Sequence, residues 1–149
     1  MTSPEPLTVE IRLPSVLGQE TIAVAAAAAM AWNLGFSQDR IDDLKTAVSE
    51  ACLNAIEHGN QLQADVQVQV TLTPKPSGLQ VEVADEGPGT PRPGQAPSIE
   101  AKLAGQERSR GWGLFLIEQL VDEVTFKPRS QGRSVTCLLI HLDSQEAHS

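Results

Sequence analysis

Residues 44–58 read Leu44-Lys-Thr-Ala-Val-Ser-Glu50-Ala-Cys-Leu-Asn54-Ala-Ile-Glu-His58, and this stretch decides the fold. Glu50 and Asn54 are four residues apart, so on a helix the carboxylate and the amide share one face. A carboxylate can accept a proton, and an amide oxygen can ligate a hard cation without adding charge. Such pairs are common on solvated helices, so the meaning of this one depends on the rest of the chain.

The surrounding residues predict a helix that begins after Ser37, which is a suitable cap, and stops at Gly59-Asn60. Apolar residues recur at three- and four-residue intervals and form an amphipathic stripe at Ile41, Leu44, Val48, Ala51 and Ala55. The stripe centres away from the face of Glu50 and Asn54, and Ala47 and His58 fall on that same polar flank. We therefore expect a helix with a core edge and, beside it, a row of small and polar residues.

The flanking sequence predicts strands and helices on both sides of this helix. Pro14 breaks a first alternating strand, and Ser15 is expected to cap the helix that follows and ends at Gly35. A hairpin turns at residues 74–78 and leads into a later helix and two last strands. The expected strands are 8–13, 66–72, 79–83, 124–126 and 134–142, and the other expected helices are 16–34 and 114–121.

Composition bounds the class of protein. The chain has 149 residues, 40% hydrophobic and 20% charged, which suits one domain, with a core over about residues 8–142. Its net charge of −8 and the absence of a Lys/Arg cluster argue against nucleic acid as a direct ligand, but allow a single nucleotide. Cys52 and Cys137 are expected to be buried free thiols.

The N-terminus has neither a basic segment nor an apolar core of a leader peptide, and the Ala-rich stretch 22–30 is too short to span a bilayer. We expect a cytoplasmic protein without a membrane anchor.

A strand runs directly into Asp85-Glu-Gly87-Pro-Gly89. The two glycines can adopt backbone angles closed to other residues and let a ligand approach the main chain, while Asp85 can accept hydrogen bonds from an amino group such as that of adenine. The same composition is frequent in plain turns, so both interpretations stand. Residues 90–110 form a long Pro-rich connection, of a kind that often serves as a lid over a site.

Gly111-Trp-Gly113 opens the later helix, where backbone amides and the helix dipole can meet phosphate, although a hinge would have the same composition. Arg108 and Arg110 precede it and could reach a terminal phosphate or remain solvated. His58 could flank the site or be satisfied by neighbouring backbone at the helix end.

The order of these motifs resembles that of the GHKL ATPases, the superfamily of gyrase, heat-shock chaperone ATPases, mismatch-repair MutL proteins and histidine kinases. Residues 44–58 and 111–124 are more specifically similar to bacterial anti-sigma serine kinases. The resemblance covers about residues 8–142. It implies an α+β fold: a two-layer sandwich with a mostly antiparallel sheet of four or five strands and helices on one face.

The resemblance also implies roles. Glu50 would be the general base and Asn54 the Mg²⁺ ligand. ATP would be bound by Asn54, His58, Asp85, Gly87, Gly89, Arg108, Arg110, Gly111, Gly113 and Leu114, with Asp85 recognising the adenine amino group. Members of the family often carry Gly-Thr before the last strand, whereas here Gly132-Arg-Ser-Val-Thr136 leaves open whether Ser134, Thr136 or neither supplies that hydroxyl.

The predicted function is that of an ATP-dependent serine/threonine-protein kinase and anti-sigma factor. It would bind a sigma factor and phosphorylate a serine of an anti-anti-sigma (STAS-type) antagonist in a partner-switching system, and the resemblance adds homodimerisation. The alternative is a binding module that changes partners with nucleotide occupancy and has no significant kinase activity. The retention of Glu50, which nucleotide binding alone does not need, favours the kinase.

Overall fold

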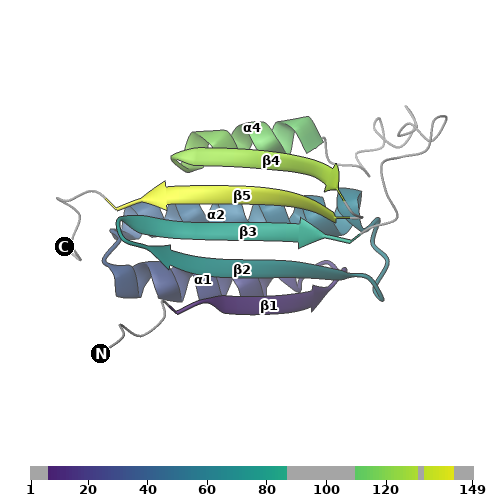
Figure 1. The fold of residues 1–149 in the computed structure, drawn as a ribbon, viewed down its shortest axis with the longest axis horizontal. Coiled ribbons are helices and arrows are strands. Elements are labelled where there is room, and N and C mark those ends of the chain that lie inside the picture. Colours follow the sequence, from purple (N-terminus) through teal and green to yellow (C-terminus); the bar gives the residue numbers. More distant parts are fainter. Residues whose placement is uncertain (1–6, 87–109, 131–132, 143–149) are drawn as a thin grey trace.

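The fold is built on a five-stranded antiparallel sheet, in a computed structural model that describes residues 7–86, 110–130 and 133–142 (Figure 1). The strands are β1 (Val9–Pro14), β2 (Gln67–Lys75), β3 (Gly78–Asp85), β4 (Glu123–Ser130) and β5 (Arg133–His141). Their order in the sheet is β1-β2-β3-β5-β4. The hairpin expected around residues 74–78 is present, with Lys75 paired to Gly78.

Alternation along the strands gives the sheet one covered and one open face. In β2 the buried residues are Val68, Val70 and Leu72, while Gln69 and Thr71 between them stay partly exposed. The helices lie together behind the sheet in Figure 1 and cover the buried face. This arrangement confirms the predicted two-layer α+β sandwich with helices on one face.

Two antiparallel helices form most of the second layer: α1 (Glu20–Leu34) and α2 (Gln38–Asn54). Ser37 caps α2 by accepting a hydrogen bond from the Arg40 backbone N–H at 3.4 Å, as predicted. The prediction for Ser15 was wrong, because α1 begins only at Glu20. The Ser15 hydroxyl instead donates to the carbonyl of Val66, 51 residues away, at 2.5 Å.

Helix α4 (Arg110–Leu120) packs against α2. It covers the flank of α2 that the sequence suggested was polar, and Ala47 on that flank is wholly buried. The flank is therefore partly interior: Ala47 and Asn54 are buried, while Glu50 and His58 are half-buried.

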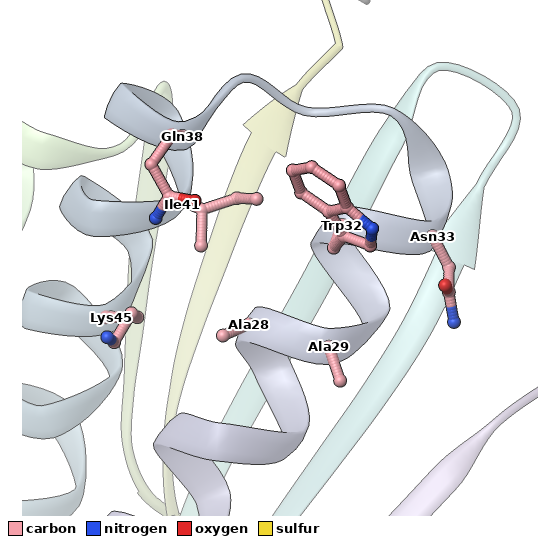
Figure 2. A pocket seen from close by; sticks show the side chains of 7 residues that line it. All are labelled: Ala28, Ala29, Trp32, Asn33, Gln38, Ile41 and Lys45. Atoms are coloured by element: carbon pink, nitrogen blue, oxygen red, sulfur yellow. The ribbon is translucent and has the colours of Figure 1, made fainter. Parts of the chain in front are cut away.

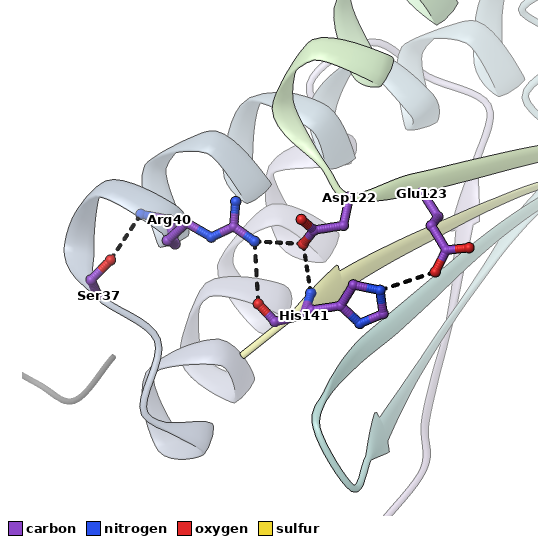
Figure 3. A network of polar contacts seen from close by, with 5 residues as sticks. All are labelled: Ser37, Arg40, Asp122, Glu123 and His141. Carbon is purple, nitrogen blue, oxygen red and sulfur yellow. Dashed lines mark hydrogen bonds and ion pairs between the residues drawn. The ribbon is translucent and has the colours of Figure 1, made fainter. Parts of the chain in front are cut away.

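A polar cluster joins Arg40 near the start of α2, Asp122 after α4 and His141 at the end of β5 (Figure 3). The Arg40 guanidinium donates to Asp122 Oδ2 at 2.6 Å and to the His141 carbonyl at 3.2 Å, and the His141 backbone N–H donates to Asp122 Oδ2 at 2.7 Å. His141 Nε2 also lies 3.0 Å from Glu123 Oε2. The cluster fixes the start of α2 to the end of α4 and the end of β5.

Burial of the Asp122 carboxyl opposes its ionisation, but the His141 N–H and the Arg40 guanidinium outweigh this and lower its pKa. Within the described ranges, no helix is both long and apolar enough to cross a bilayer.

Candidate functional site

The candidate residues gather at one end of the molecule. α2 and β3 both end there and α4 begins there, at the right of Figure 1. Three segments far apart in the sequence, near residues 54, 85 and 113, therefore meet at the same edge of the two layers.

Asn54 is the most unusual side chain at this end. It is only 4% exposed, yet neither Nδ2 nor Oδ1 has a hydrogen-bond partner. Buried polar groups are almost always paired, so an orphaned amide indicates a group suited to binding a ligand. The amide oxygen suits a hard cation such as Mg²⁺. Among the described residues no cluster of three or more His, Cys, Asp or Glu side chains could hold a metal ion.

Gly113 makes room for this amide. A Cβ added at Gly113 would lie 2.8 Å from Nδ2 of Asn54, closer than real Cβ atoms approach other atoms, and 3.0 Å from Oδ1, which is also tight. A residue with a side chain would therefore push α4 or the amide away. Gly113 lets the first turn of α4 lie against Asn54, so the structure brings these two predicted residues together.

Glu50 precedes Asn54 by one turn of α2 and is half-buried. Beyond Asn54 the helix changes to a π-turn, η1 (Ala55–Gly59), in which the Asn60 N–H donates to the Ala55 carbonyl at 2.7 Å. His58 lies half-buried within this turn. π-turns are rare and occur frequently at functional sites, because they re-aim side chains that a regular helix would place elsewhere.

Asp85 is the last residue of β3 and is 2% exposed. Its side chain lies against Gly59, where an added Cβ would be 2.7 Å from the Asp85 Cβ and closer still to its carboxylate. Across the sheet Asp85 pairs with Ser134, whereas Thr136 pairs with Val83. Directly opposed residues place their side chains on the same face about 5 Å apart, so Ser134 is the hydroxyl neighbour of Asp85.

The structure describes the remaining predicted site residues only in part. Arg110 and Gly111 form the start of α4, and Leu114 packs partly buried against the core. Gly87, Gly89, Arg108 and the expected lid at 90–110 lie outside the described residues.

The sequence reasoning missed Gly59 and Asn60, which it interpreted only as a helix stop. Asn60 is completely buried, and its side chain bonds to three partners, of which Ser15 and Glu86 come from distant segments. A glycine followed by a buried amide at a helix end was the available signal, but its partners are not visible in the sequence.

Three other features do not belong to the set of candidate site residues. Cys52 is buried, and burial together with the nearby Glu20 raises the pKa of its thiol to about 12. Cys137 is only half-buried, contrary to the expectation of two buried thiols. A groove of about 350 Å³ lies between α1 and α2, around Trp32 and Lys45 (Figure 2). None of the candidate residues lines it.

Comparison with known proteins identifies this arrangement. The model of the histidine kinase-like ATPase domain matches residues 14–139. The chain belongs to this ATPase family. It is 31% identical to serine-protein kinase RsbW of Bacillus subtilis over 126 residues, 82% of this chain and 79% of that protein. It is 36% identical to serine-protein kinase RsbW of Bacillus licheniformis over 99 residues, 64% of this chain and 62% of that protein.

The fold is similar to that in the crystal structure of the RsbU and RsbW domains of Rv1364c from Mycobacterium tuberculosis. The TM-score is 0.63 at 20% identity, and the match covers 96% of this chain and 34% of that one. The resemblance noted from the motifs is thereby confirmed: they belong to a histidine kinase-like ATPase with RsbW-type relatives, and ATP is the nucleotide that this family implies.

Proposed function

We propose that this protein is an ATP-dependent serine/threonine-protein kinase that acts as an anti-sigma factor. It phosphorylates a serine of a STAS-type anti-anti-sigma antagonist and so switches between that partner and a sigma factor. The similarity to RsbW serine-protein kinases over most of the chain supports the activity. The observation that carries the proposal is the buried, unpaired Asn54 amide, one helical turn after Glu50 and against Gly113.

In this proposal the chain divides the work between two side chains of α2. Glu50 accepts the proton of the substrate serine hydroxyl as that hydroxyl attacks the γ-phosphate. The Asn54 amide oxygen would hold Mg²⁺, which would supply charge neutralisation at the triphosphate. A neutral amide suits this position because it ligates the ion without adding a charge that would repel ATP.

Other elements bind the adenine ring and the phosphates of ATP. Asp85 accepts hydrogen bonds from the adenine amino group, with the Ser134 hydroxyl beside it. The start of α4, from Arg110 to Leu114, binds phosphate through its N–H groups and dipole. His58, Gly87, Gly89 and Arg108 complete the ATP site as the family resemblance implies. In this proposal the chain is a single domain, with a core over about residues 8–142 and a lid over about residues 90–110. The protein acts in the cytoplasm and forms a homodimer.

The test combines Mg-ATP, the protein and purified STAS-type proteins of the same organism, with mass spectrometry of the products. We expect a phosphoserine on one of them, and release of the bound sigma factor when that protein is unphosphorylated. If ATP occupancy alone switches partners and no phosphoserine forms, the binding-module alternative is correct.

A further inference from the structure

Asn60 connects the ends of several elements at the candidate site. Its Nδ2 donates to Ser15 Oγ at 2.8 Å and to the Gln67 carbonyl at 3.1 Å, and its Oδ1 accepts from the Glu86 backbone N–H at 3.0 Å. Ser15 in turn donates to the carbonyl of Val66. One fully buried amide therefore joins the end of β1, the start of β2 and the residue that follows β3.

The backbone directly after Asn60 has an unusual conformation. Gln61 and Leu62 have φ values of 52° and 59°, in the left-handed region that residues other than glycine rarely occupy. The Leu62 N–H donates to the Ile56 carbonyl at 2.8 Å and holds the bend. Strain of this kind persists where the surrounding structure over-determines it, and such places cluster at functional sites.

Gly59 acts on the same strand end by a different contact. Its Cα lies directly against the Asp85 side chain, so that a methyl group at position 59 would overlap the carboxylate. The last residue of the π-turn and the residue after it thus hold the last residue of β3 and the residue after that: Gly59 meets Asp85, and Asn60 binds Glu86. A short aspartate side chain has few rotamers, so the position of its carboxylate follows the position of its backbone.

We infer that Gly59 and Asn60 are positioning residues that place the Asp85 carboxylate for recognition of the adenine amino group, with Ser15 supporting Asn60. The inference rests on the proposed function, which assigns Asp85 to adenine. A purely structural role would lower stability without changing which base is preferred. A positioning role changes the preference itself, because a hydrogen bond to a displaced carboxylate is weakened only for a base that carries the amino group.

The test compares binding of ATP with binding of ITP, which has an oxygen where adenine has the amino group. For the unmodified protein we expect ATP to bind tighter by on the order of 10- to 100-fold, the ratio expected for a charge-assisted hydrogen bond. In Asp85→Asn the ratio should fall to about 1. Asn60→Ala and Gly59→Ala should each lower it at least about threefold. Ser15→Ala should lower it less, since the Asn60 side chain keeps its two backbone partners.

Arg40→Ala is the matched control for lost stability. It breaks a polar network at the opposite end of α2 and should lower the melting temperature with the ATP/ITP ratio intact. Circular dichroism would establish that each variant is folded. If Asn60→Ala does not fold, Gly59→Ala and Ser15→Ala decide the question, because both retain Asn60.

Two results would overturn the inference, and they are distinguishable. If Asp85→Asn abolishes the preference while Gly59→Ala and the Asn60 or Ser15 variants keep it, positions 59 and 60 serve stability alone and the proposed function stands. If Asp85→Asn itself keeps the preference, Asp85 does not read adenine, and its assignment in the proposed function fails as well.

Discussion

Replacing Asn54 with leucine should stabilise the nucleotide-free protein and abolish its Mg²⁺-dependent binding of ATP. Leucine branches at Cγ as asparagine does, and it removes two buried polar atoms that have no partner. Burying an unpaired amide costs about 1–3 kcal/mol by protein mutational data. For a chain of about this size each kcal/mol corresponds to about 2–4 °C in melting temperature. We therefore expect Asn54→Leu to melt several degrees higher.

The assay is thermal unfolding without nucleotide, followed by titration of Mg-ATP. Asn33→Leu is the matched control, because it makes the same substitution at an exposed position of α1 and should change the melting temperature little. A stabilised Asn54→Leu that no longer binds Mg-ATP would show that this amide is held unsatisfied for a ligand. A melting temperature lowered in Asn54→Leu but not in Asn33→Leu would refute the reasoning, since the amide would then have a partner in the free protein.

Three other predictions follow from individual contacts. Gly113→Ala should weaken ATP binding at least about tenfold, because the added Cβ would displace the Asn54 amide. The control is Gly35→Ala, whose φ of 101° strains an alanine although no atom lies within 4 Å of the added Cβ; it should lower stability and leave ATP affinity unchanged. Calorimetric titration measures the affinity of each variant, and thermal melts measure its stability. The lowered folded pKa of Asp122 stabilises the protein above its unfolded value of about 3.9, and this contribution is lost as pH falls through the lower folded value. The difference in urea midpoint between wild type and Asp122→Asn should therefore be full at pH 6 and shrink below about pH 4. Cys52, with a thiol pKa of about 12, should resist iodoacetamide at pH 8 until the protein is unfolded, as mass spectrometry of the alkylated protein would show.

Much of the fold could be predicted because its signals are local. Period-two alternation in 66–72 and 79–83, and the prolines and glycine between them, predicted a hairpin that the structure contains. Ser15 shows the limit. It has the residue type of a helix cap, but its hydroxyl satisfies a carbonyl 51 residues away, and a local rule cannot anticipate a partner at that distance.

The order of the motifs predicted the residues of the candidate site, but it did not predict how those residues are buried or what they contact. The spacing of Glu50 and Asn54 gave the shared helix face, but that Asn54 is buried without a partner depends on α4 packing against α2. The sequence likewise placed Ala47 on a polar flank and did not show that it is wholly buried. The contact of Gly59 with Asp85 joins residues of two different elements, so no pattern along either one reveals it.

The most direct test of the central claim is the rate of serine phosphorylation in Glu50→Gln at saturating Mg-ATP. Glutamine keeps the size of the side chain but cannot accept the proton, so we expect the rate of transfer to fall by about 10²–10⁴-fold with ATP affinity within a few-fold of wild type. Glu118→Gln, the same change at an exposed position of α4, should leave both unchanged. Phosphorylation at the wild-type rate in Glu50→Gln would contradict the assignment of Glu50 as the base.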